Sequence, residues 1–457
     1  MSEISIFQQY SITDVVRRVA EGTLAPEEIA AAVIRRLPPG DSPQGVFAAY
    51  DPASLLRMAE NCGAYLRSGN PPRPLEAIPL GVQDTINTAC LPTQMGSPLL
   101  DKFTPGNDAR IVFNSLRRGA LVAGKTATSE FGLYSPSPVP NPYDTSRIAG
   151  TAAAGGAVAV ATGVVPAALG TQTAGSIVHA ASHCGIYGCK PSFGTIPRTG
   201  VLQCAASLDT VGFLAFHAED MTLLFDTLRV HGPNYPLSHA ALSKGRDGAS
   251  NRDRPRRIAL LKTHTWPHAA DYAQEALLHF AQSVDALPGC EVVQTEPPAE
   301  LRAAHELFAV IYRKSIAHYL DSYFQIPERL SPHTLESIEL GRAITPEEYM
   351  EALKAQSNAA RAMDTFLAEY DAAFSLAATG IAPRWEEWEQ IDPSLMWTMT
   401  HLPVVCAPAF TGPQGLPFGV QVLARRFDDY GLFAFVDMLC RQEVLPACSR
   451  PAPHRIV

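Results

Sequence analysis

The chain has 457 residues, of which 46% are hydrophobic and 18% are charged, and its formal net charge is −9. This composition is typical of a globular protein with a large core and excludes a mainly disordered chain. The negative charge and the lack of a basic run argue against nucleic acid as a partner.

The nine cysteines have no regular spacing, and none forms a CxxC pair. We therefore expect reduced thiols in a cytoplasmic protein, with Cys184, Cys189 and Cys204 as small buried residues. Because no metal-ligand spacing is present, we expect no metal and no other cofactor. The N-terminus lacks a basic region followed by an apolar core, and Gly and Pro break every long apolar run. These features predict neither a signal peptide nor a membrane span.

Helices and short strands alternate in the first part of the chain. The predicted elements are two helices within residues 11–37 that are split at Gly22-Thr23, a helix over 55–66, a strand near 78–82, a helix over 108–119 and a buried strand over 120–124. A proline-rich segment at 71–74 ends the third helix. This alternation favours an α/β fold around a mixed sheet.

The stretch from Gly150 to Lys190 is crowded with glycine, alanine and serine. Small residues let two segments approach closely and leave backbone N–H groups free to bind an oxyanion or a carbonyl. Tight packing of a helix against a sheet uses the same residues. Composition alone therefore supports a binding site and a packing contact equally.

The order of the residues favours a site. A resemblance to the amidase signature family rests on Gly170-Thr171-Gln172-Thr173-Ala174-Gly175-Ser176 and on Cys184-Gly185-Ile186-Tyr187-Gly188-Cys189-Lys190-Pro191. Further similar segments lie at 80–84, 91–97, 124–132, 141–143, 207–212 and 415–421. On these matches the chain is identified as a member of the family. The resemblance is dense over 80–212, sparse over 402–430 and nearly absent over 230–395.

The resemblance implies an α/β fold in which a single amidase-signature domain, residues 1–457, holds a mixed central β-sheet covered by helices on both faces. The signature core would span 80–212, and the variable region that forms the substrate pocket would span about 230–395. Residues 402–457 would return to the core.

The middle of the chain is less informative. Residues 243–257 are polar and predict a surface loop, a strand follows at 258–261, and helices are predicted at about 270–285, 298–321 and 346–369. Aromatic residues there could line a pocket, although core packing is the favoured interpretation for Tyr312, Tyr319, Trp385, Trp388 and Trp397. The acidic residues are predicted to form a solvated face at Glu386, Glu387 and Glu389.

The resemblance also implies a catalytic lysine, a relay serine and a nucleophilic serine, and these positions hold Gln83, Ala152 and Ser176 here. A carboxamide is not basic and a methyl group cannot relay a proton, so we expect only the nucleophile to remain in this degenerate triad. The three positions should converge in space. A charged pair that braces the family's nucleophile loop corresponds to Gln172 and Val178, so we expect that brace to be missing.

One class of function that fits is an enzyme acting on an amide, ester or thioester carbonyl, by hydrolysis or acyl transfer, through a non-standard mechanism. Ser176 would be its nucleophile. The oxyanion hole would consist of backbone N–H groups from Thr173, Ala174 and Gly175. An activated ester or thioester would need less catalytic help than an amide.

Such an enzyme needs a substitute base. His179 and His183 follow Ser176 by three and seven residues, and they share its face if the segment is helical. A buried histidine that only forms structural hydrogen bonds is the competing interpretation. Thr151 offers a second hydroxyl, one position from the relay site.

The second class is a catalytically inactive amidase homologue that serves in binding or as a scaffold within a complex. The changes at Gln83, Ala152, Gln172 and Val178 favour it, whereas the preserved nucleophile loop favours an enzyme slightly. The expected partner is a small-molecule or carrier-bound acyl or amide substrate, and further options are a homodimer or a partner subunit. Nucleic acid and membrane are not expected as partners.

Overall fold

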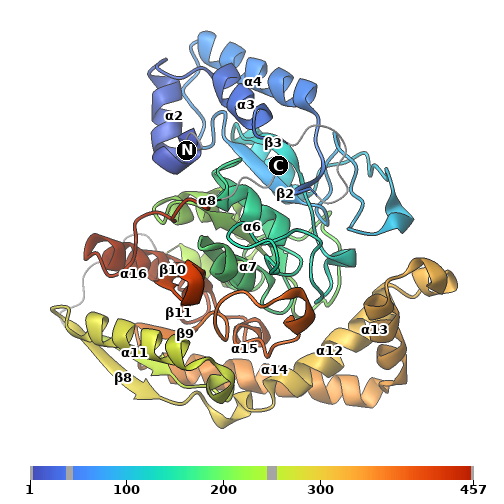
Figure 1. The fold of residues 1–457 in the computed structure, drawn as a ribbon, viewed down its shortest axis with the longest axis vertical. Coiled ribbons are helices and arrows are strands. Elements are labelled where there is room, and N and C mark those ends of the chain that lie inside the picture. Colours follow the sequence, from blue (N-terminus) through green and yellow to red (C-terminus); the bar gives the residue numbers. More distant parts are fainter. Residues whose placement is uncertain (1–3, 38–44, 244–254, 454–457) are drawn as a thin grey trace.

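A computed structural model describes residues 4–37, 45–243 and 255–453 (Figure 1). Eleven strands within these ranges form one sheet. They are β1 (Phe47–Ala49), β2 (Pro79–Gln83), β3 (Leu121–Thr126), β4 (Ala167–Gln172), β5 (Tyr187–Lys190), β6 (Thr210–Ala215), β7 (Arg256–Leu261), β8 (Cys290–Thr295), β9 (Ala372–Leu376), β10 (Val404–Thr411) and β11 (Pro417–Leu423). Their order across the sheet is β1-β3-β2-β4-β6-β5-β10-β11-β9-β7-β8.

The sheet is mixed, as predicted. Strand β2 is parallel to β3 and β4, and β7 is parallel to β8 and β9, whereas the remaining neighbours are antiparallel. The helices of the described residues are α1 (Ile6–Gln9), α2 (Ile12–Ala20), α3 (Pro26–Ile34), α4 (Pro52–Arg67), α5 (Arg110–Arg117), α6 (Ala154–Ala161), α7 (Ser176–Cys184), α8 (Asp220–Leu228), α9 (Pro236–Leu242), α11 (Asp271–Asp285), α12 (Ala304–Tyr319), α13 (Pro332–Ala343), α14 (Pro346–Leu367), α15 (Leu395–Met399) and α16 (Asp429–Arg441).

Helices cover both faces of the sheet. Helices α6 and α7 pack against each other and against the central strands, while α8 and α16 contact each other and the strands β6, β10 and β11. Figure 1 shows α6 and α7 in the middle of the molecule, with α2–α4 at one end and α12–α14 at the other. The centre of the fold therefore carries the segment that the sequence singles out.

Small residues account for the close packing of α6. All eight of its residues, AGGAVAVA, are buried, so the helix has no solvent face. An added Cβ on Gly156 would lie 3.1 Å from the Ala168 methyl group and 3.2 Å from Leu214. The helix can approach β4 and β6 this closely only because it lacks larger side chains.

Glycine and proline residues mark the ends of predicted helices. The split between α2 and α3 falls at Gly22, whose φ of 70° suits glycine, and α3 begins at Pro26. The elements predicted after them are confirmed as α4, β2, α5, β3, β7, α11, α12 and α14. Most of the predicted loop at 243–257 lies outside the described residues. Among the described helices, none is long and apolar enough to cross a membrane.

The side-chain predictions are confirmed for the cysteines and the glutamates and are mixed for the aromatic residues. Cys184, Cys189 and Cys204 are buried, and Glu386, Glu387 and Glu389 are exposed. Tyr312 and Trp397 are buried in the core, and Tyr319 and Trp385 are half-buried. Trp388 lines a small cavity that is described below.

Gly212 on β6 provides a test of the packing under the site. An added Cβ there would overlap the carbonyl oxygen of Cys189 and lie 2.8 Å from the Ile177 side chain. Neither the backbone oxygen nor the buried helix can move away cheaply, so we expect Gly212→Ala to lower the free energy of unfolding by about 1–3 kcal/mol. Urea unfolding measures this change.

The matched control is Gly63→Ala on α4, where the added Cβ meets only the ends of the Arg67 and Glu27 side chains. These long side chains reach solvent and can shift, and alanine is the better helix former, so this variant should keep nearly the wild-type stability. Equal losses in the two variants would contradict the packing described for β6.

Candidate active site

The nucleophile loop links the end of β4 to the start of α7, with Ser176 as the first residue of the helix. The side chain of Gln172 closes this turn, because its Oε1 accepts the N–H groups of Ile177 at 3.0 Å and Val178 at 3.1 Å. Its Nε2 donates to the Thr398 hydroxyl at 3.1 Å. The expected loss of a charged brace is therefore compensated by neutral hydrogen bonds that satisfy the open end of the helix.

The oxyanion-hole candidates lie in the same loop. Hydrogen bonds of a side chain and of a carbonyl group hold these residues and leave their N–H groups unused. The Thr173 hydroxyl donates to Asp209 at 2.7 Å, and the Ala174 carbonyl accepts from Thr398 at 2.5 Å. The described residues provide no backbone acceptor for the N–H groups of Thr173, Ala174 or Gly175. These donors are consequently available to bind a carbonyl oxygen if one can reach them.

Ser176 is buried, with an exposed fraction of 4%. The hydroxyl of Thr151, from the turn before α6, donates to Ser176 Oγ at 3.0 Å. The structure thus places a second hydroxyl against Ser176, contributed by the residue that precedes Ala152.

Gln83 and Ala152 both lie close to Gly132. A Cβ added to Gly132 would be 3.6 Å from Gln83 Nε2 and 3.8 Å from the Ala152 methyl group. The Gln83 carboxamide accepts the Thr171 N–H at 2.9 Å and donates to the Thr85 and Thr171 hydroxyls, each at 3.0 Å. These hydrogen bonds connect β4 to β2. This structural role does not require a basic side chain at position 83.

A lysine does lie near Gln83, on the neighbouring strand β3. Lys125 is buried 3.4 Å from Asp84, the residue after Gln83, and it donates to the Thr93 hydroxyl at 2.6 Å. Burial lowers the pKa of Lys125 to about 8. This lysine lines neither of the two cavities described below, so it does not replace the family lysine at the site.

The two histidines of α7 lie one turn apart on its buried side, and their rings stack with centroids 5.7 Å apart. Nε2 of His179 lies 3.0 Å from Oδ1 of Asp392. The imidazole and the carboxylate therefore face each other directly. Burial acts to raise the pKa of Asp392, but His179 and the Ser394 N–H outweigh it and hold that pKa below its usual value.

Asp392 is a charged residue of the candidate site that sequence reasoning missed. Its carboxylate packs directly on Gly175, where an added Cβ would overlap both oxygens. It comes from the region of nearly absent resemblance, more than two hundred residues after His179, and no spacing in the sequence links the two. Only the fold brings this carboxylate to the nucleophile loop.

A small inner cavity adjoins these groups. It has a volume of about 20 Å³ and is bounded by Thr151, His179 and His183 together with Tyr134, Trp388 and Gln390. Thr151, which contacts Ser176, is one of its lining residues, whereas Ser176 is not. In this conformation the cavity has room for a single water molecule and not for a substrate.

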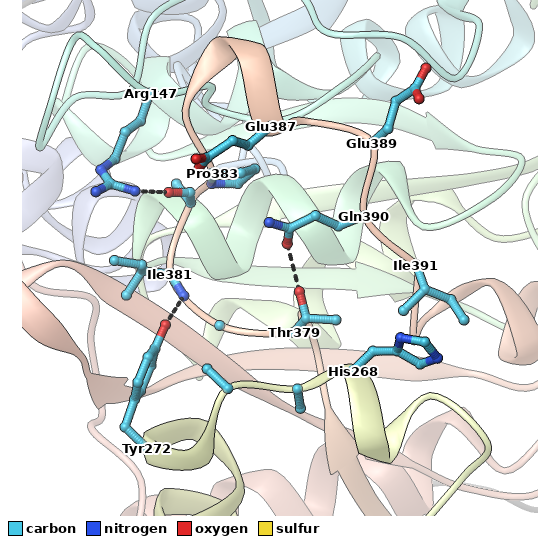
Figure 2. A pocket seen from close by; sticks show the side chains of 14 residues that line it. Arg147, His268, Tyr272, Thr379, Ile381, Pro383, Glu387, Glu389, Gln390 and Ile391 are labelled. Carbon is cyan, nitrogen blue, oxygen red and sulfur yellow. Dashed lines mark hydrogen bonds between the residues drawn. The ribbon is translucent and has the colours of Figure 1, made fainter.

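A larger outer pocket of about 480 Å³ lies on the other side of the segment 379–391 (Figure 2). Four residues line both spaces, namely Thr379, Pro383, Gln390 and Ile391. The Thr379 hydroxyl donates to Gln390 Oε1 at 2.6 Å across this wall, and Figure 2 shows the bond between the two ends of the segment. Residues 268–391 supply most of the lining of the outer pocket, together with Arg147, and the segment 379–391 borders both the outer pocket and the inner cavity.

Comparison with known proteins gives consistent results. Over 231 residues the chain is 38% identical to a glutamyl-tRNA(Gln) amidotransferase subunit of Thermus thermophilus, and this match covers 49% of the chain and about half, 47%, of that relative. It is 24% identical over 462 residues to the protein of the same name from Chlamydia pneumoniae, covering 92% of the chain and 93% of the relative.

Among solved structures, a chain from a vestigial protein complex described as revealing the evolutionary origins of an s-triazine catabolic enzyme has a similar fold. Its TM-score is 0.83 at 23% identity, over 97% of this chain and all of that one. The Amidase family model matches residues 28–433, which include β1 to β11 and every site residue discussed above. The chain therefore belongs to the amidase family.

Proposed function

We propose that this protein is an enzyme that acts on an amide, ester or thioester carbonyl, by hydrolysis or acyl transfer, with Ser176 as the nucleophile. The observation that carries the proposal is the 3.0 Å contact between the Thr151 and Ser176 hydroxyls. Thr151 also lines the inner cavity together with His179. A hydroxyl in this place can take the role that the resemblance gives to the relay serine, whose position holds Ala152.

The base in this proposal is His179. Burial lowers the pKa of His183 to about 3, so its ring is neutral at physiological pH and is a weak base. His179 is instead paired with Asp392, which can stabilise the imidazolium that forms when the ring takes a proton. Because Nε2 faces the carboxylate, Nδ1 is the nitrogen left to accept that proton.

The proposed reaction begins when Ser176 Oγ attacks the carbonyl carbon and forms a C–O bond. The Ser176 proton passes to Thr151, and the Thr151 proton moves on toward His179 after the hydroxyl hydrogens rotate. The carbonyl oxygen takes up the negative charge next to the N–H groups of the nucleophile loop. Collapse of this intermediate breaks the bond to the leaving group, which receives the proton from His179. Water or another acceptor then removes the acyl group from Ser176.

Substrate access requires the inner cavity to open. Gln390 and Ile391 line both this cavity and the outer pocket, and Trp388 lines the inner cavity. The Trp388 ring packs against Tyr134 at a centroid distance of 6.1 Å, and Gln390 is held by Thr379. In the proposal, displacement of this segment joins the two spaces, so that a substrate seated in the outer pocket presents its carbonyl to Ser176.

A second candidate function is that of a catalytically inactive subunit, which binds a partner or a ligand. The burial of Ser176 and the small volume of the inner cavity favour it. The relatives named as amidotransferase subunits support a role beside other proteins in a complex. In this case Ser176 would be a packing residue and the outer pocket or the outer surface would carry the function.

Reaction with a fluorophosphonate separates the two functions, because the reagent modifies an activated serine without knowledge of the natural substrate. If the protein is an enzyme, we expect one phosphonyl group on Ser176, identified by peptide mass spectrometry. His179→Gln and Thr151→Val should each slow the labelling by about 10²-fold, since proton transfer from Ser176 would lose its path.

Ser176→Ala should abolish the labelling, whereas Ser182→Ala, a buried serine further along the same helix, should leave the rate unchanged. A folded wild-type protein that does not react with the reagent would support the inactive, binding function. Labelling that is insensitive to His179→Gln would retain Ser176 as nucleophile and remove His179 as its base.

The neutrality of His183 has a separate consequence for stability. Its pKa of about 3 in the folded protein lies below the ordinary value of about 6.5, so the unfolded chain binds this proton first. The stabilisation is complete above pH 6.5 or so and is lost as the pH falls toward the folded pKa. His183→Gln should therefore reduce the pH dependence of the unfolding free energy by up to about 1.4 kcal/mol per pH unit in this range.

Urea unfolding at about pH 7, 6 and 5 measures this slope. The exposed His231→Gln should keep the wild-type slope and serves as the control. A wild-type slope in the His183 variant would show that this ring titrates normally in the fold and would make it a candidate base again.

A further inference from the structure

The inner cavity has the properties of a binding site for one small molecule. Its volume of about 20 Å³ exceeds the roughly 10–15 Å³ that a single water molecule needs, and it excludes anything of several heavy atoms. Apolar cavities of this size stay empty, so the nature of the lining decides whether it is occupied.

The lining contains a buried polar atom without a protein partner. Nδ1 of His183 has no hydrogen-bond partner within the described residues, although His183 is only 4% exposed. Leaving such a group unsatisfied costs about 1–3 kcal/mol. The Thr151 hydroxyl, which donates to Ser176, still has lone pairs that can accept a hydrogen bond.

The charge and hydrogen-bonding capacity of the lining atoms indicate which kind of ligand the cavity can bind. In the described part of the chain no group of three or more His, Cys, Asp or Glu side chains could hold a metal ion. The neutral His183 ring and the Thr151 hydroxyl attract a neutral molecule that both donates and accepts hydrogen bonds. Two to four polar partners around a volume of this size are what an ordered buried water requires.

We infer that the inner cavity is a specific site for one ordered water molecule, bound by the Thr151 hydroxyl, His183 and the ring of His179. The role of this water rests on the proposed function: it connects Thr151 to His179 as the carrier of the Ser176 proton. The Ser176 proton moves to Thr151, the Thr151 proton moves to the water, and a proton of the water moves to His179, so the water is regenerated.

His183 has a positioning role in this arrangement. Its ring nitrogen holds the water without competing for the proton, because the ring remains neutral. This assigns the two histidines of α7 different tasks, with His179 as the proton acceptor and His183 as the anchor of the water. It also explains why a deeply buried histidine is useful beside a site that already has a base.

A crystal structure of the wild-type protein at a resolution that shows ordered water tests the site directly. We expect one density peak in the inner cavity, about 2.6–3.2 Å from His183 Nδ1 and from Thr151 Oγ1. His183→Leu should remove this peak, whereas Ile148→Val, which also alters a residue of the cavity wall but removes no polar atom, should retain it. A wild-type cavity without density, or one filled by a rearranged side chain, would overturn the inference.

A second experiment tests whether the water transfers the proton. The rate of fluorophosphonate labelling in mixtures of light and heavy water should vary with the deuterium fraction along a curve, because several protons move together. In His183→Leu the rate should fall about tenfold or more, while Ile148→Val stays near the wild-type rate. A straight-line dependence would overturn the relay but not the site. A protein that is not labelled would contradict the proposed enzyme function, and the crystal structure would still decide whether the water is bound.

Discussion

The buried carboxylate of Asp392 is the constraint on which the site depends. A charge in the interior is costly unless other groups compensate it, and here His179 and the Ser394 N–H do so. His305 from α12 fixes the same residue through its main-chain carbonyl at 2.9 Å. The carboxylate in turn packs on Gly175, a position that no larger residue could occupy. One charged group therefore connects the variable region, helix α7 and the nucleophile loop.

Neutral side chains perform the bracing that the family resemblance assigns to charged ones. Gln172 binds two N–H groups at the start of α7, and Gln83 ties Thr171 to β2. Amides can donate and accept at once, so each of them satisfies several buried groups without adding a charge. These hydrogen bonds hold the loop, although the side chain at the lysine position has no basicity. A preserved loop geometry is compatible with catalysis and with a purely structural use.

The sizes of the inner cavity and the outer pocket bear on which of the two proposed functions the protein has. The inner cavity accommodates one water molecule, whereas the outer pocket is large enough for a small-molecule ligand. A single segment, with Gln390 bonded to Thr379, separates them. An enzyme would have to move this segment in each turnover and break hydrogen bonds such as those of Ile381 with Tyr272 and of Ala382 with Arg147. A protein that only binds would keep it closed, and the outer pocket would then be the whole site.

The sequence by itself determined the elements and the family, because amphipathic periodicity, glycine and proline signals and the small-residue stretch around Ser176 are local patterns. It also indicated His179, His183 and Thr151, since a helix starting at Ser176 places the two histidines on one face. Only the tertiary structure decided that Thr151 contacts Ser176, that Asp392 pairs with His179 and that Gln172 replaces the charged brace. Most of these contacts join residues that are far apart in the chain. Their distances depend on how helices α6 and α7 and the segment 379–391 pack on the sheet, and a local sequence pattern does not specify this packing.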